Sequence, residues 1–567
     1  MAVMKTPGVY IVEKDAFPNS IVEVATAVPV FIGHTEKAVN GNRSLRNVPW
    51  RISSMAEFIT YFGAPPPAQF GLTTKQPEAR DDIYAVTPVQ DPADISLGGT
   101  DYWLPQTSTP YLMSAAMSLF FQNGGGPCYI VSIGGYGDDF DASKMTKPLI
   151  ALEKEQEPTL VVVPEAVRLS HQDCISVQQA MLAHCGKMMN RFAVLDVWDG
   201  WRDRQDPAGD MVDAFRDKLG INFLNYGCAY YPWVNTTIYQ TRDISFSQFD
   251  DDGKTALQTL LRAELGLPAA SDGGNAPAGG GASAGGDTPA GGGASAGGDT
   301  PAEGETAAEG NASAGGAAAP AASSLTPAQQ QLEKAIASIT DDWTGKPDDK
   351  AMLEKMLQTQ SLLYRELTGH IAGKLNLIPP AAAMVGIYTM VDATRGVWKA
   401  PANVSLASVV SPTVNISNAE QEDLNVTPMG KSINAIRPFI GEGVLVWGAR
   451  TLDGNSLDWR YINVRRTMIM IEESVRLAAK AYVFEPNTAN TWITIKAMIA
   501  NFLTGIWKAG GLAGAVPEDA FSVHVGLGET MTANDILEGI LRVTVLLAPT
   551  RPAEFIEITF QQQQQRS

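Results

Sequence analysis

The sequence predicts a multidomain protein of mixed α/β and α+β class. Between residues 128 and 233, short β-prone runs alternate with a helical stretch, a pattern typical of parallel strands covered by helices. A low-complexity stretch at 269–325 interrupts the chain, and the residues after 380 carry a second set of strand and helix patterns. The 567 residues correspond to three or four domains at about 150 residues each.

The strands expected before the low-complexity stretch are short apolar runs bounded by glycine, proline or polar residues. They cover 29–33, 128–133, 159–163, 192–197 and 228–233. Ser108, followed by Pro110 at the first helical position, predicts the start of a helix that ends at Asn123 and three glycines. A further helix is expected at 172–187, so the order along 159–197 is strand, helix, strand.

The stretch at 269–325 is rich in glycine and alanine and contains no lysine or arginine. Residues 277–288 read PAGGGASAGGDT, and residues 289–300 repeat the same letters. This composition lacks the apolar side chains that a core needs, so we expect a flexible linker or surface loop. Ser283 and Ser295 match the nucleophile pattern G-x-S-x-G, but both lie in this stretch without the required strand and helix around them.

Two helices are expected between the linker and residue 379. Thr326 and Pro327 open the first, and the second carries an apolar stripe from Leu353 to Ile371 that Gln360 interrupts. The patterns beyond residue 380 predict strands at 444–447 and 543–547 and amphipathic helices at 468–482 and 492–510.

The charge balance excludes some classes of partner. Lysine and arginine number 42 and aspartate and glutamate 61, which gives a net charge of −19. A strongly acidic chain is a poor non-specific binder of nucleic acid and of anionic membranes. No apolar run reaches the roughly 18 residues of a membrane-spanning helix, and no signal-peptide core is present at the N-terminus. We therefore expect cytoplasmic synthesis, no nucleic-acid partner and no membrane insertion.

The residues that carry catalysis or bind metals form no recognisable set. His171, Cys174, His184 and Cys185 are close in sequence but lack the paired spacing of a zinc site. The glycines at 124–126 precede a strand instead of following one, and they lack the Lys-Ser/Thr of a phosphate loop. The sequence therefore favours a protein that is not an enzyme and has no cofactor. The alternative is an enzyme of α/β hydrolase-like or nucleotide-binding type.

Two β-prone segments lie next to the termini. Residues 8–12 read GVYIV and residues 555–560 read FIEITF. In an extended chain, Phe555, Glu557 and Thr559 would share one face and the intervening residues the other. Both segments fit either pairing inside their own subunit or donation of a strand to a neighbouring chain.

These segments belong to a wider resemblance to contractile tail sheath proteins, the family of phage tail sheaths, R-type tailocin sheaths and sheaths of extracellular contractile injection systems. Near the N-terminus the sequence resembles that family at 6–13, 24–37 and 120–131. The denser C-terminal resemblance comprises 396–403 (GVWKAPAN), 446–452 (VWGARTL), 461–466 (YINVRR), 483–487 (VFEPN) and 552–555 (PAEF). The segment 136–375 is weakly matched, and the Gly/Ala-rich linker departs from the family pattern.

The resemblance implies a discontinuous inner sheath core domain, built from both chain ends, and an inserted α/β domain that faces outward. The corresponding divisions are an N-terminal arm (1–20), a core (21–135 and 380–550), an insert (136–375, including the linker at 269–325) and a C-terminal arm (551–567).

The resemblance also implies a structural subunit that polymerises helically around an inner tube in hexameric rings, and contracts to drive the tube through a target envelope. Its partners would be further copies of itself and the tube, baseplate and tail-terminator proteins, in a phage tail or phage-tail-like particle made in the bacterial cytoplasm. Strand exchange between subunits is assigned to Val9, Tyr10, Ile11, Val12, Phe555, Ile556, Ile558 and Phe560. The candidate tube contacts are Glu472, Glu473, Arg476 and Lys480, on the polar face of the helix expected at 468–482.

Overall fold

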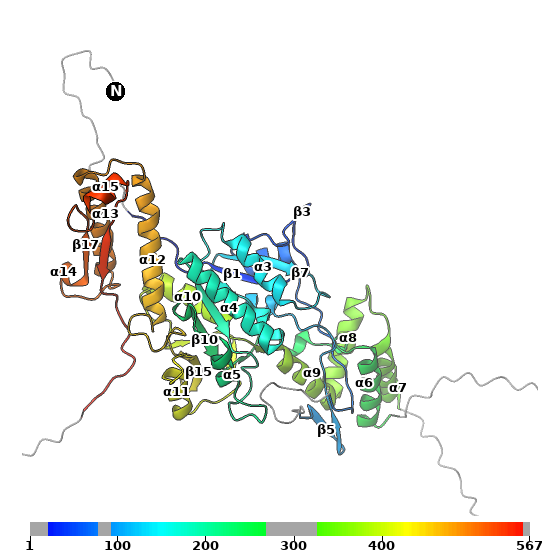
Figure 1. The fold of residues 1–567 in the computed structure, drawn as a ribbon. Helices are drawn as coiled ribbons and strands as arrows, with labels where there is room; N and C mark the ends of the chain where they lie inside the picture. The colour runs from blue at the N-terminus through cyan, green and yellow to red at the C-terminus, as the bar shows by residue number, and fades with distance from the viewer. Residues whose placement is uncertain (1–20, 78–91, 268–325, 560–567) are drawn as a thin grey trace, which may run out of the picture. The chain divides into compact units, whose positions relative to one another are not determined.

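A computed structural model of the protein describes residues 21–77, 92–267 and 326–559 (Figure 1). The expected strand at 9–12, the linker at 269–325 and Phe560 lie outside the described residues. The chain divides into two compact units, of which one comprises Met1–Gly253 with Arg365–Ser567 and the other Lys254–Tyr364.

The first unit is built on one nine-stranded mixed sheet. Its central strands run parallel in the order β7-β1-β8-β9-β10-β15, and antiparallel strands complete both edges, with β4 beside β7 and β16 and β13 beyond β15. The strands are β1 (Pro29–His34), β4 (Trp50–Ile52), β7 (Cys128–Gly134), β8 (Leu160–Val162), β9 (Phe192–Asp196), β10 (Gly227–Tyr231), β13 (Val404–Ser405), β15 (Asn434–Phe439) and β16 (Gly443–Trp447). The expected parallel α/β layer is therefore confirmed.

Strands from both sides of residue 136 take part in this sheet. β1 and β7 come from the segment expected to form the core, whereas β8, β9 and β10 come from the expected insert. Val30 of β1 is in register with Val161 of β8. The second compact unit, Lys254–Tyr364, is shorter than the expected insert at 136–375. Which parts face inward or outward in an assembly stays a prediction.

Helices cover both faces of the sheet (Figure 1). α2 (Met113–Gln122) and α10 (Ala381–Arg395) pack on one face, which includes Phe31 of β1. α3 (Ala142–Leu152), α4 (His171–Met188) and α5 (Met211–Lys218) pack on the opposite face, which includes Val30. Because both faces are buried, β1, β7, β8, β9 and β10 are largely apolar runs, and for that reason these five strands could be predicted from the sequence, whereas β15 was not predicted.

A buried carboxylate closes the carboxyl ends of β1 and β8. Glu165, in the 3₁₀ turn η1 (Pro164–Arg168), accepts the backbone N–H of His34 at 2.9 Å, and its Oε2 lies 2.6 Å from His34 Nδ1. Its Oε1 accepts the amides of Leu112 (3.2 Å) and Met113 (3.3 Å) at the start of α2. Because β7 and β8 flank β1 on opposite sides, this is the switch point where α/β sheets bind ligands, often anions at a helix N-terminus. Here the protein's own carboxylate takes the anion position.

The second unit is helical. Its elements are α6 (Asp251–Glu264), α7 (Pro327–Ala337), α8 (Pro347–Gln360) and the first residues of α9 (Leu362–Leu375). The prediction of a single helix carrying the stripe from Leu353 to Ile371 is wrong, because α8 ends at Gln360 and α9 begins at Leu362, with Ser361 between them. The carboxylate of Glu264 accepts the amides of Leu362 (2.9 Å) and Leu363 (3.0 Å), so a residue about a hundred positions away caps α9.

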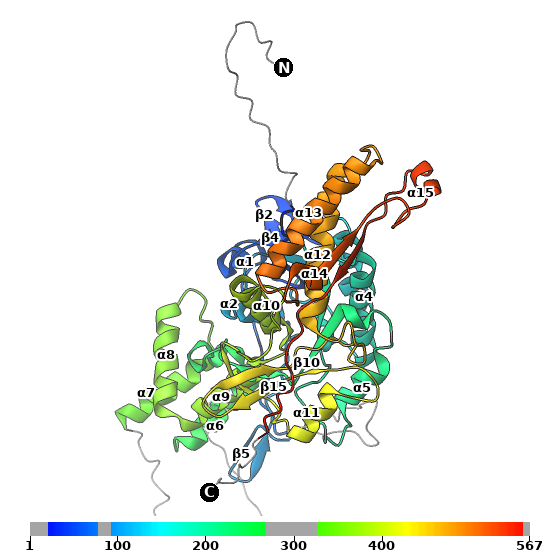
Figure 2. The same ribbon diagram turned by 90° about the vertical axis from the view of Figure 1, so that its left-hand side faces the viewer.

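The C-terminal part of the first unit has a small core of its own. α12 (Ile462–Ala479) and α13 (Ala489–Lys508) pack against a hairpin of β17 (Phe521–His524) and β18 (Thr544–Leu547), and Figure 2 shows both helices beside α14 (Pro517–Ala520). α15 (Ala533–Leu537) lies in the connection between the two strands. The helices expected at 468–482 and 492–510 and the strand at 543–547 are confirmed, although α12 begins earlier than expected.

The remaining elements are short and connect these parts. They are β2 (Val39–Asn40), β3 (Arg43–Ser44), α1 (Met55–Phe62), β5 (Ile95–Leu97), β6 (Thr100–Tyr102), β11 (Val234–Thr236), β12 (Leu377–Ile378), β14 (Val409–Pro412) and α11 (Asn418–Asn425). α2 begins at Met113 and not at Pro110, because Glu165 supplies the cap at that point.

Replacing Glu165 with alanine should destabilise the first unit by about 3–5 kcal/mol, because it leaves buried His34 and two amides of α2 without their acceptor. Thermal and urea unfolding of the purified protein measure this loss. Glu442→Ala, in the exposed turn between β15 and β16, is the matched control and should change stability by less than about 0.5 kcal/mol. Equal stability of the two variants would contradict the role given to Glu165.

Candidate functional site

The first described residues, from 21 onward, are held against three distant elements. The backbone N–H of Val24 donates to the hydroxyl of Ser474 in α12 at 3.1 Å. The hydroxyl of Thr26 donates to Asp392 in α10 at 2.6 Å, and its carbonyl accepts from Thr159, just before β8, at 2.8 Å. The point where the N-terminal arm leaves the folded body is therefore fixed by side chains of the sheet and of the C-terminal part.

A buried ion pair forms the centre of this junction. The guanidinium of Arg466 in α12 donates to both carboxylate oxygens of Asp392, at 3.0 and 2.5 Å, and to the carbonyl of Thr26 at 3.0 Å. Its plane lies over the ring of Tyr388 at 4.7 Å. The side chains of Arg466 and Asp392 are 3% and 7% exposed, so water does not compete for the bidentate pair.

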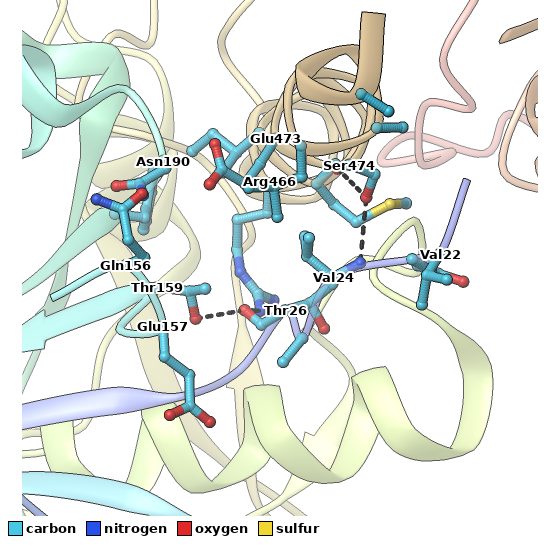
Figure 3. Close-up of a pocket in the computed structure, with 18 residues that line it drawn as sticks. Val22, Val24, Thr26, Gln156, Glu157, Thr159, Asn190, Arg466, Glu473 and Ser474 are labelled. Carbon is cyan, nitrogen blue, oxygen red and sulfur yellow. Dashed lines mark hydrogen bonds between the residues drawn. The ribbon is translucent and has the colours of Figure 1, made fainter. Parts of the chain in front are cut away.

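A cavity of about 590 Å³ opens beside the junction (Figure 3). Its walls come from the segment 22–26, from the residues before and at the start of β9 and those before β8, from α12 between Arg466 and Ala478, and from the turn that follows α12. Glu23 lines it, and burial, with a smaller contribution from Asp392, raises the pKa of its carboxyl group. Glu473 lines it as well, which places one candidate tube contact at the base of the N-terminal arm.

The other candidate tube contacts lie along the same helix and take part in pairs within the chain. Arg476 donates to Glu473 at 2.5 and 2.7 Å and reaches Gln156 at 3.1 Å. Glu472 accepts from Arg465 at 3.1 Å, and burial raises the pKa of Glu472 against the opposing effect of that arginine. Lys480 is exposed at the start of η6 (Lys480–Tyr482). The structure thus places Glu472, Glu473 and Arg476 on α12 and Lys480 in the 3₁₀ turn that directly follows it, and their contact with a tube stays a prediction.

The hairpin of β17 and β18 has two unpaired edges within the described part of the chain. The two strands pair only with each other, from Phe521 opposite Leu547 to His524 opposite Thr544. Exposed edges of this kind present a row of free N–H and C=O groups to a further strand. Leu546 of β18 is also exposed. The hairpin therefore has the geometry of a strand acceptor.

The C-terminal segment continues beyond the hairpin (Figure 2), and the side chain of Glu554 anchors it. Glu554 accepts two hydrogen bonds from Arg450 at 2.9 and 2.6 Å, one from Asn425 at 2.8 Å and one from Tyr461 at 3.2 Å. Burial raises the pKa of Glu554, but the hydrogen bonds from Arg450 and Asn425 outweigh it and hold the pKa below its usual value. The anchor is therefore charged at neutral pH.

Beyond this anchor the side chains assigned to strand exchange are exposed. Phe555 is 75% exposed, Ile556 79% and Ile558 68%, in a segment without regular secondary structure up to residue 559. Three exposed apolar side chains within four residues are typical of a segment that contacts a partner. Val9, Tyr10, Ile11, Val12 and Phe560 lie outside the described residues. All eight residues stay predictions as exchange sites.

Among the described residues, no cluster of His, Cys, Asp and Glu is placed to hold a metal ion. The four cysteines are buried and unpaired, with Cys174 and Cys185 inside α4. No helix in the described part of the chain is long and apolar enough to cross a membrane.

Two functional groups escaped the sequence reasoning. Arg466 and Asp392 pair across 74 positions, and Arg450 and Glu554 across 104. The available signal was an arginine in an otherwise apolar run, since a buried cation requires a partner. Which acid it pairs with depends on the three-dimensional fold.

Residues 455–563 match the family model of the phage tail sheath C-terminal domain. That range contains α12, α13, the β17–β18 hairpin and the anchored C-terminal segment. This part of the chain is therefore similar to the C-terminal domain of phage tail sheaths, and the resemblance seen in the sequence is confirmed.

Among curated proteins, the tail sheath protein of Vibrio phage KVP40 is 24% identical over 187 residues, which are 32% of this chain. The chain spans only about a quarter of the length of that relative, 26%. Among solved structures, the PVC sheath complex of an extracellular contractile injection system, in its contracted state, matches with a TM-score of 0.54. It is 23% identical and covers 99% of both chains. The contracted helical sheath of the anti-feeding prophage also gives 0.54, at 24% identity, covering 99% of this chain and all of that one. The chain has the fold of these contractile sheath proteins.

Asp392→Asn should loosen the N-terminal junction, because it leaves the buried guanidinium of Arg466 without a counter-charge. We expect a lower unfolding temperature and faster proteolysis between residues 21 and 28. Asp139→Asn, at an exposed position, is the matched control. Proteolysis at the same rate in both variants would show that Asp392 does not hold the segment.

The anchor at Glu554 should depend on pH in one direction. Because its pKa in the folded state lies below the usual value, the stabilisation is full above the usual pKa and is lost as the pH falls through the folded value. A nitroxide label at Thr559→Cys should become more mobile over that acidic range. In Glu554→Gln the label should be more mobile already at neutral pH, because the equilibrium between the anchored and the released C-terminal segment shifts about tenfold or more toward release. Glu557→Gln, in the same segment, should leave the mobility unchanged; equal mobility in both variants would rule out the anchor.

Proposed function

We propose that this protein is the structural sheath subunit of a contractile tail or tail-like injection particle. Subunits polymerise helically, as stacked rings, around an inner tube and contract to drive the tube through a target envelope. The observation that carries the proposal is the combination, inside the sheath-type C-terminal domain, of an open-edged hairpin and an anchored segment with exposed apolar side chains.

Strand exchange links the subunits in this proposal. The segment at 555–560 of one copy adds to an edge of the β17–β18 hairpin in a neighbour, and residues 9–12 of another copy add to the same small sheet. Backbone hydrogen bonds supply most of the affinity, and alternating side chains set the register. A head-to-tail contact of this type does not close on itself, so it generates an open helical polymer.

The two anchors support a role for the arms as tethers. Glu554 fixes one arm and the junction of Thr26, Asp392 and Arg466 fixes the other, so each arm pulls on the folded body at a defined point. During contraction the bodies rotate and slide while the arms keep neighbours connected. Interfaces that switch together from a metastable extended state release the energy, and no nucleotide is required.

The remaining partners follow from the same proposal. Glu472, Glu473, Arg476 and Lys480 face the inner tube, with Lys480 and the half-exposed Arg476 supplying the positive charges. Baseplate and tail-terminator proteins contact the two ends of the polymer. The protein acts without catalysis as part of a phage tail or phage-tail-like particle assembled in the bacterial cytoplasm.

Polymer formation tests the proposal directly. Placing aspartate at both Ile556 and Ile558 should abolish hollow striated cylinders in electron micrographs, because one face of the donated strand can no longer pack. Thr559→Asp, on the opposite face of the strand, is the matched control and should still polymerise.

Purified protein that stays in discrete particles would be tested again with the tube protein co-expressed, since the tube provides a template. Normal cylinders from the double variant would contradict strand exchange through 555–560. Discrete particles from the wild-type protein even with the tube present would contradict the sheath function.

A further inference from the structure

A second cavity, of about 490 Å³, lies next to the carboxyl end of β8. Arg168, the last residue of η1 after that strand, lines it together with Leu112 at the start of α2. Open α/β sheets bind ligands at this edge. Glu165 fills the anion position at the helix N-terminus, but the neighbouring cavity stays open.

Arg168 carries a charge that nothing in the described part of the chain neutralises directly. Its Nε is enclosed and has no hydrogen-bond partner, and no described residue forms an ion pair with its guanidinium. The group lies over the ring of Trp233 at 5.9 Å. Burial lowers the pKa of Arg168, and the negative charges of Asp199 and Glu165, which form no ion pair with it, oppose this effect.

Both of these acids already interact with other basic side chains. Glu165 binds His34, and Asp199 lies 3.5 Å from Arg202. A guanidinium in a largely enclosed site without its own carboxylate is costly, because its desolvation is not compensated. This imbalance points to a missing anion.

The other polar groups of the cavity define what that anion is. Tyr239 lines the cavity, its hydroxyl bonds to no described residue, and burial raises its pKa, so it is a neutral donor. Lys374 is occupied by Asp94 at 2.8 Å and by the carbonyl of Leu104. Asp243, which accepts the backbone N–H of Gln240, would repel a second negative charge.

Apolar side chains form part of the remaining wall, among them Pro65, Pro66, Pro67, Ile238 and Leu375, and polar side chains form the rest, among them Gln106, Thr109, Ser114 and Gln248. One cation without an ion-pair partner among the described residues, with neutral donors and an apolar patch beside it, suits a single negative charge on a largely apolar body. A dianionic phosphate would bring a second negative charge that this one cation does not neutralise. The volume lies in the range of small-ligand sites.

We propose that this cavity is a carboxylate-binding site, in which Arg168 and Tyr239 hold the carboxylate and the proline-lined wall holds an apolar body. The carboxylate belongs either to a small free acid or to an Asp or Glu side chain of a second copy in the polymer. Both sources present the same chemistry to Arg168.

The probe is 4-fluorobenzoate, observed by fluorine NMR with the full-length protein at concentrations below polymerisation. Its uncharged analogue 4-fluorobenzamide has the same shape and should bind at least about tenfold more weakly, because it lacks the charge. Arg168→Gln should weaken benzoate binding by a similar factor, and Tyr239→Phe by roughly twofold to tenfold. Arg395→Gln, at the exposed end of α10, is the control and should bind like the wild-type protein.

Equal binding of benzoate and benzamide to the wild-type protein would overturn the proposal, and this comparison holds even if a variant folds poorly. Unchanged benzoate binding in a folded Arg168→Gln variant would overturn it as well. Binding to both subunits and polymer would assign the site to a free acid. Binding to subunits alone, with slower polymerisation of Arg168→Gln, would assign it to a neighbouring copy.

Discussion

The bidentate pair between Arg466 and Asp392 connects parts of the chain that would otherwise be independent. α10 packs on the large sheet, and α12 leads into the C-terminal module, the small core formed by α12, α13 and the β17–β18 hairpin. Thr26 lies at the end of the N-terminal segment 22–26. An ion pair that is almost fully buried is costly to break, because either partner alone would be an uncompensated charge. A force applied to the N-terminal arm is therefore passed to the sheet and to α12 together, and not to a loop.

The large sheet and the C-terminal module differ in whether the polar groups at their edges have hydrogen-bond partners within the described chain. At the switch point, Glu165 satisfies His34 and the first amides of α2, so the place where related α/β folds hold a ligand is closed from within. In the C-terminal module the hairpin edges are left unpaired. The first arrangement leaves no polar group of the switch point open to a ligand, and the second leaves backbone groups that the proposed assembly would pair.

Local patterns were sufficient for β1, β7, β8, β9, β10 and β16 and for α4, α12 and α13, because burial on one or both faces leaves a clear periodicity. They did not predict β4, β13 and β15 of the same sheet. Local patterns failed where a side chain distant in sequence determines where a helix begins or ends. Glu264 breaks the expected long helix at Ser361, and Glu165 sets the start of α2 at Met113. The segment at 555–560 was proposed as a donated strand from its alternation alone; its residues up to 559 have no regular secondary structure, so the strand stays a prediction. Its anchor at Arg450 could not be found, since the pairing spans 104 positions.

The exposed C-terminal segment also bears on how the protein stays soluble before it assembles. A run of β-forming residues with several apolar side chains in solvent is a template for aggregation through identical segments. Glu557 lies in the middle of this run and is exposed. In a parallel in-register stack, every copy would place this carboxylate beside the same carboxylate of the next, and like charges at that spacing repel. Self-stacking is thus penalised at the centre of the segment, whereas pairing with a different strand carries no such penalty. Under the proposed strand exchange, a single acidic residue would therefore act as a gatekeeper that disfavours stacking of identical segments and leaves the segment available for a different strand.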